Sequence, residues 1–84
     1  MNQPTPLARI LRILTLLSPL APVSLEMMAR ELGVSRWTVR KDLAILSRVP
    51  EVDLYTLVDG RFAIGSVGYR RLLSLFRRVG ELGR

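Results

Sequence analysis

The residues best suited to chemistry are basic and aromatic side chains between positions 36 and 44. In a helix this stretch brings five side chains to one face, because their spacing is i, i+1, i+4, i+5 and i+8: Arg36, Trp37, Arg40, Lys41 and Ala44. Three of the five are cations and none is acidic. Arginine and lysine donate hydrogen bonds to phosphates and guanine edges, so this face is typical of nucleic-acid recognition.

The composition argues against other kinds of site. The chain has no cysteine and no histidine, which removes disulfides, the usual zinc ligands and histidine base catalysis. Its seven acidic residues are scattered without a paired spacing, and there is no glycine-rich phosphate loop. Tyr55 and Tyr69 fall on apolar stripes. We therefore expect no enzyme activity, no metal site and no cofactor.

Two predicted helices position the basic face. Ser24 can cap a helix that begins at Leu25, and Gly33 supplies the positive φ that ends it. Ser35 can cap the next helix, which we expect from Arg36 to about Ser47 with a core stripe of Val39, Leu43 and Leu46. Two short helices joined by such a turn have the layout of a helix-turn-helix.

A further helix is predicted before this motif. Residues 1–6 contain two prolines, and we expect them to form a flexible arm. The helix that follows, residues 7–17, carries one apolar stripe at Leu7, Ile10, Leu11, Leu14 and Leu17. It carries a second at Ile13, Leu16 and Leu20. Because a surface helix needs only one apolar face, the second stripe requires additional cover.

A β-hairpin is predicted after the motif. Two β-rich runs, residues 52–58 and 61–64, flank Asp59-Gly60, a pair typical of a two-residue turn. That turn pairs Leu57 with Phe62 and Tyr55 with Ile64, so all four side chains would face the helices. Arg61 would lie at the tip. Three helices followed by a hairpin form a winged helix.

The last predicted helix runs from Val67 to about Leu82, with an apolar stripe at Tyr69, Leu72, Leu73, Phe76 and Val79. Residues 61–84 hold six basic and one acidic residue, net +5, whereas residues 1–60 hold seven and six, net +1. Four arginines face away from the stripe: Arg70, Arg71, Arg77 and Arg78. They could form a solvated surface, contact the DNA backbone, or contact an acidic protein.

The unpaired apolar stripes predict self-association. We expect a homodimer held by the first and last helices, with an interface formed by Ile13, Leu16, Leu20, Leu72, Phe76 and Val79. Two-fold symmetry would place the two Arg36–Ser47 helices about 34 Å apart, which is one turn of DNA.

The predicted fold class is therefore mostly α with a small β-hairpin. It comprises a winged helix-turn-helix over residues 7–64 and an additional C-terminal helix over residues 65–84, the expected dimerisation element. Within it, residues 29–46 resemble the helix-turn-helix of DeoR-type bacterial repressors, whose motif is Val-Ser, two variable residues and Thr-Ile-Arg-Arg-Asp-Leu. The corresponding residues here are Val34-Ser35 and Thr38-Val39-Arg40-Lys41-Asp42-Leu43.

The resemblance implies a role for individual residues. Ser35 and Thr38 would lie at a helix N-terminus near a phosphate, and Arg40 and Lys41 match the family's paired basic residues, which face the DNA. Trp37 falls at a variable position and inherits no role. The family usually carries a large C-terminal effector domain, whereas one helix follows the hairpin here. We therefore expect no small-molecule effector domain.

We expect sequence-specific binding of double-stranded DNA by a homodimeric transcriptional regulator. The expected base-groove contacts are Arg36, Trp37, Arg40 and Lys41, and the expected phosphate contacts are Ser35, Thr38 and Arg61. The alternative is a winged-helix adaptor that binds a polymerase or replication protein through Trp37 or the last helix. The apolar run of residues 10–20 is too short to span a bilayer and no signal-peptide pattern appears, so we expect a cytoplasmic protein without a membrane partner.

Overall fold

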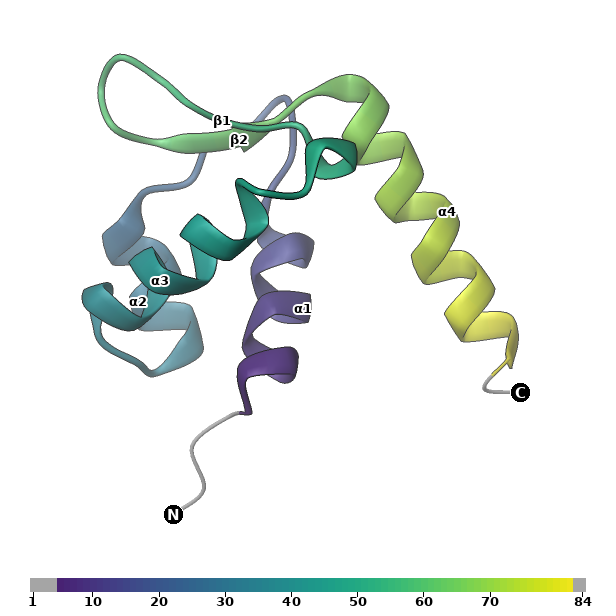
Figure 1. The fold of residues 1–84 in the computed structure, drawn as a ribbon, viewed down its shortest axis with the longest axis horizontal. Coiled ribbons are helices and arrows are strands. Elements are labelled where there is room, and N and C mark those ends of the chain that lie inside the picture. Colours follow the sequence, from purple (N-terminus) through teal and green to yellow (C-terminus); the bar gives the residue numbers. More distant parts are fainter. Residues whose placement is uncertain (1–4, 83–84) are drawn as a thin grey trace.

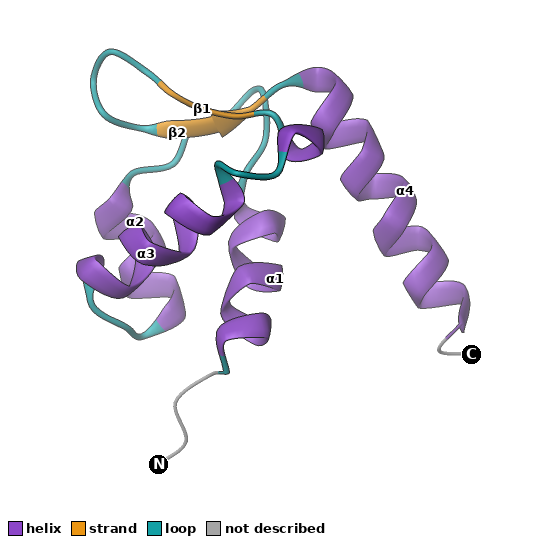
Figure 2. Cartoon of the chain, viewed as in Figure 1, coloured by secondary structure: helices purple, strands orange, loops and turns teal. Residues whose placement is uncertain are grey.

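Helices form most of the molecule, and a small hairpin covers one end of them (Figures 1 and 2). The structure, a computed structural model, describes residues 5–82. Its elements are α1 (Pro6–Leu16), α2 (Leu25–Leu32), α3 (Arg36–Leu46), the short 3-10 helix η1 (Pro50–Val52), β1 (Leu54–Thr56), β2 (Phe62–Ile64) and α4 (Ser66–Leu82). The predicted fold, a winged helix-turn-helix followed by a C-terminal helix, is confirmed. Of the predicted arm, residues 1–6, the first four lie outside the described residues, whereas Thr5 and Pro6 cap and begin α1 and so are not part of an arm.

Hydroxyl side chains begin three of the helices. The side chains of Thr5, Ser24 and Ser35 each accept a hydrogen bond from the backbone N–H three residues later, at 3.1–3.2 Å. Because Thr5 caps α1, that helix begins at Pro6, one residue earlier than predicted. Gly33 ends α2 with φ of 68°, and its N–H returns to the carbonyls of Ala29 and Arg30.

The core lies between the first three helices and the hairpin. Its fully buried side chains come from every one of these parts: Ile13 and Leu17, Met28, Val39, and Ile64. The predicted stripe of α3 faces this core. The face of α1 was predicted only in part, because Leu14 and Leu17 of the first stripe are buried but Leu7 and Leu11 are exposed, and Ile13 of the second stripe is fully buried. The second stripe of α1 is therefore covered largely by the chain itself.

The hairpin has a different register from the prediction. Leu54 pairs with Ile64, Tyr55 with Ala63 and Thr56 with Phe62. Leu57 N–H donates to the Arg61 carbonyl and Gly60 N–H to the Leu57 carbonyl, which makes a three-residue turn with Gly60 at φ of 89°. A one-residue change of register reverses the faces of a strand, so Tyr55 is exposed rather than part of the core. Val23 adds a short antiparallel bridge to Phe62.

Helix α4 joins the rest of the molecule through η1. A Cβ at Gly68 would overlap the carbonyl oxygen of Val52 and lie 2.7 Å from its carbonyl carbon, so this close approach requires glycine. Leu72 is buried one turn later, whereas Leu73, Leu75 and Val79 are exposed. Figure 1 shows α4 running away from the hairpin toward the C-terminus. Helix α4 therefore packs on the chain through Gly68, Tyr69, Leu72 and Phe76 and leaves its other apolar side chains exposed.

Candidate nucleic-acid interface

The outward face of α3 carries the predicted basic cluster. Val39, Leu43 and Leu46 are buried beneath it, and the five side chains of the opposite face are exposed: Arg36, Trp37, Arg40, Lys41 and Ala44. This outward face contains no acidic residue, since Asp42 points inward with 2% of its surface exposed. The face can thus approach a polyanion without an acidic group of α3 in the way.

The N-terminus of α3 is held by two hydroxyls. Ser35 Oγ accepts from the Thr38 N–H at 3.1 Å and lies 3.0 Å from Thr38 Oγ1. Ser35 is exposed and Thr38 half-buried, so both predicted phosphate contacts lie beside the first turn. Amide groups that lack a helical partner and the helix dipole favour an anion at this end.

Trp37 projects from α3 and is 66% exposed. The Lys41 Nζ lies 3.9 Å from the centroid of its ring, one helical turn further on. Such a cation–π contact contributes roughly 0.5–1 kcal/mol at an exposed site. It covers part of the ring with a cation and leaves a large apolar surface available to a ligand.

Two of the predicted DNA contacts are paired with acidic residues that sequence reasoning did not assign to them. Arg36 Nη1 lies 3.6 Å from Glu26 Oε1, and both side chains are more than half exposed, so this pair is weak. Arg61 is held more closely. Its backbone N–H donates to Asp59 Oδ1 at 3.1 Å, and its side-chain Nε donates to Asp59 Oδ2 at 2.7 Å. These hydrogen bonds hold the pKa of Asp59 below its ordinary value. Asp59 thus offsets part of the charge of Arg61 within the wing.

The inner side of α3 is fixed by a buried ion pair with α1. Arg9 Nε donates to Asp42 Oδ2 at 2.8 Å, and its Nη2 donates to Oδ1 at 3.2 Å. The hydrogen bonds from Arg9 to this carboxylate raise the pKa of Arg9. The two partners are 33 residues apart along the chain. The two-pronged geometry orients α3 on α1.

Arg40 lies at the centre of the interface. It borders a hollow over the start of α3, a second beside the turn of the wing, and a third between α3 and the strands. Within residues 5–82 it makes no ion pair, unlike Arg36 and Arg61. Arg40 is therefore a cation between α3 and the wing that has no salt-bridge partner in the described part of the chain.

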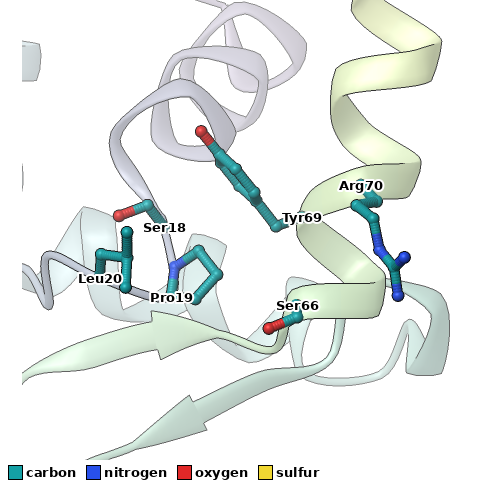
Figure 3. Close-up of a pocket in the computed structure, with 6 residues that line it drawn as sticks. All are labelled: Ser18, Pro19, Leu20, Ser66, Tyr69 and Arg70. Carbon is teal, nitrogen blue, oxygen red and sulfur yellow. The ribbon is translucent and has the colours of Figure 1, made fainter.

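The arginines of α4 form a separate basic surface. Arg70, Arg71, Arg77 and Arg78 are all exposed on this helix. Arg70 borders an apolar hollow of about 300 Å³ between the loop after α1 and the start of α4, where Tyr69 and Leu20 also lie (Figure 3). The guanidinium of Arg70 points away from Tyr69 and that hollow (Figure 3). This group is available to a partner outside the hollow.

The predicted dimer residues do not form one exposed surface. Ile13 and Leu72 are buried within the chain, Leu16 and Phe76 are partly buried, and Leu20 and Val79 are exposed. Leu20 lies in the loop after α1 and not on the helix. Instead, a hollow between α1 and α4 is lined by Leu11, Arg12, Thr15, Leu75, Phe76 and Val79. Leu11 and Leu75 were not predicted there, because the sequence does not give the angle between the two helices.

Comparison with known proteins agrees with this geometry. Residues 9–54, more than half of the chain, match the family described as HTH domain. The match extends from α1 through the helix-turn-helix to the first residue of β1. No curated protein matches the chain. No solved structure matches it either. Among the described residues, no helix is both long and apolar enough to span a membrane.

Proposed function

The chain belongs to the helix-turn-helix domain family, a family of DNA-binding domains, and we propose that it binds double-stranded DNA with sequence preference and regulates transcription. The observation that carries this proposal is the outward face of α3. It presents three cations and one aromatic ring without an acidic side chain, on a helix whose orientation is fixed by the Arg9–Asp42 pair. A helix of this kind fits the major groove.

Each part of the interface has its own proposed contact. Arg36, Trp37, Arg40 and Lys41 contact base edges, whereas Ser35 and Thr38 contact a phosphate at the start of α3. Arg61 contributes weakly, because its guanidinium already forms a salt bridge with Asp59. The motif Thr38-Val39-Arg40-Lys41-Asp42-Leu43 supports a DeoR-type relation within the helix-turn-helix family.

The test is binding of the whole protein to duplex DNA over a salt series from 50 to about 300 mM. Specific binding predicts a steep loss of affinity with salt, because counterions are released from phosphates, and a residual preference for one sequence. Absence of binding at the lowest salt contradicts the proposal. The exposed Trp37 would then favour the adaptor function, since aromatic residues often anchor protein interfaces.

A paired variant locates the DNA surface. Replacing Arg40 and Lys41 together with Ala should lower DNA affinity at least tenfold, because two groove contacts are removed. The matched control replaces Arg77 and Arg78 with Ala, which removes the same charge from α4. An equal loss in both variants would mean that charge alone, and not the α3 face, determines binding.

We further propose that the protein is a homodimer formed through the hollow between α1 and α4. The lining of this hollow is apolar, and the exposed side chains of Leu75 and Val79 on α4 of a second copy have the matching character. Arg70 and Arg77 project from the opposite side of α4, away from Leu72 and Phe76, so they do not oppose the approach. Dimerisation would cover the half of α4 that the single chain leaves exposed.

A further inference from the structure

The hollow at the start of α3 brings a guanidinium and an indole ring together. Its lining comprises Ser35, Arg36, Trp37 and Arg40, and it encloses about 470 Å³. Trp37 and Arg40 are three residues apart, so their side chains leave the helix as neighbours about 5–6 Å apart at Cβ. This separation spans one to two stacked base pairs, which lie about 3.4 Å apart.

The two side chains offer different chemistry. Arg40 has no ion-pair partner in the described part of the chain, so its guanidinium can donate two hydrogen bonds without breaking a salt bridge. In the major groove, guanine alone presents two acceptors, N7 and O6, that match this fork. Trp37 presents an exposed apolar ring, and in unmodified DNA the apolar group of the major groove is the C5 methyl of thymine.

We propose that Arg40 and Trp37 together recognise a guanine with a neighbouring thymine: Arg40 binds N7 and O6, and the Trp37 ring packs on the thymine methyl. This inference rests on the proposed DNA binding and names the bases that the same site prefers. Lys41 Nζ lies 3.9 Å from the centroid of the Trp37 ring and favours one orientation of the ring before DNA is bound. Arg36, paired with Glu26, contributes less to the choice of base.

The experiment begins with a preferred duplex, selected by the full-length protein from a pool of random sequences. Probes then replace one thymine at a time with deoxyuridine, which lacks the methyl, or one guanine with 7-deazaguanine, which lacks N7. We expect one guanine at which affinity falls about tenfold, because half of a two-pronged contact is lost. At a neighbouring thymine we expect a loss of about threefold to fourfold, as for one buried methyl group.

Variants assign these losses to side chains. Trp37→Ala should bind the thymine and deoxyuridine probes equally, and Arg40→Ala should bind the guanine and 7-deazaguanine probes equally. Both residues are exposed, so Arg40→Ala should leave the melting temperature unchanged, and Trp37→Ala should lower it only slightly, through loss of the contact with Lys41. Arg48→Ala, a control at an exposed cation beyond the end of α3, should retain both differences.

The outcomes separate the two proposals. If no duplex is bound or enriched, the proposed function fails and the base preference fails with it. If a duplex is enriched but deoxyuridine has no effect, or Trp37→Ala keeps the thymine preference, DNA binding stands and this inference is overturned.

Discussion

At the residue scale, Asp42 has the greatest effect on the orientation of α3. Among the described residues, Asp42 is the one acidic side chain that is buried, and both of its oxygens accept hydrogen bonds from Arg9. Asp42→Asn keeps the shape but removes the charge, so we expect the free energy of unfolding to fall by about 2 kcal/mol. Urea denaturation measures this change.

The control for Asp42 is Glu31→Gln, which neutralises an exposed acid on α2 without an ion pair in residues 5–82. It should leave the unfolding midpoint nearly unchanged. An equal loss in both variants would attribute the effect to net charge and not to the Arg9–Asp42 pair.

Residues whose role is local were predictable from the sequence. Ser24 and Ser35 as caps and Gly33 as the helix terminator depend only on their neighbours along the chain, and the structure confirms all three. The partner of Asp42 was not predictable, because α1 and α3 meet only after the chain has folded. The same reason explains why Ile13 was assigned to a dimer interface although it is fully buried in the core.

At the element scale, the wing limits its own affinity for DNA. Asp59 accepts one hydrogen bond from the Arg61 backbone N–H and one from its Nε, so the carboxylate weakens the attraction between the guanidinium and a phosphate. Asp59→Asn removes this competitor. We expect affinity for duplex DNA at 50 mM salt to rise about threefold, with the salt dependence steeper by about one counterion.

The matching measurement for the wing is Arg61→Ala, which should weaken DNA binding little in the wild-type background and clearly in the Asp59→Asn background. If the effect of Arg61→Ala is the same in both, Asp59 does not compete with phosphate.

The Asp59–Arg61 contact also predicts a pH dependence. Because the pKa of Asp59 is lowered in the folded protein, the contact stabilises the wing above the ordinary aspartate pKa, about 4, and is lost as pH falls through the lower folded value. NMR titration of the Asp59 carboxyl should give a midpoint below the ordinary value. Arg61→Ala keeps the backbone hydrogen bond, which is the larger cause, and removes the side-chain one, so the midpoint should rise only part of the way; an unchanged midpoint would contradict the side-chain contribution.

The position of the hairpin was predictable from the sequence, but its register was not. Asp59-Gly60 correctly marked the turn, but the same pair suits a two-residue turn and the three-residue turn that occurs here. The choice reverses the faces of β1, so the prediction placed Tyr55 in the core although it is exposed. The bridge between Val23 and Phe62 contributes to the register and joins residues 39 positions apart, which no local pattern indicates.

At the scale of the whole molecule, the exposed half of α4 is the surface through which we propose that two copies associate. Leu75→Glu together with Val79→Glu places two charges on the proposed dimer surface, and both positions are exposed in the single chain. We expect a shift from dimer to a 9.5 kDa monomer in analytical ultracentrifugation, with lower affinity for DNA that carries two half-sites.

The control for association is Val67→Glu, an equally exposed position on another face of α4. It should leave the dimer intact. A wild-type protein that sediments as a monomer at high micromolar concentration would contradict the dimer proposal, while leaving DNA binding by the single domain in place.

The glycine contact between α4 and η1 has a consequence for how two half-sites are spaced. From Gly68 to its end at Leu82, helix α4 extends about 21 Å, and a tilt of about 10° moves its far end by about 3.7 Å. That displacement exceeds the rise of one base pair, about 3.4 Å. If two copies meet through α4, the close contact that Gly68 allows determines the direction in which α4 leaves η1. That direction in turn determines the distance between the two α3 helices. Gly68→Ala would then change the half-site spacing at which the dimer binds best, with less effect on the base preference of α3.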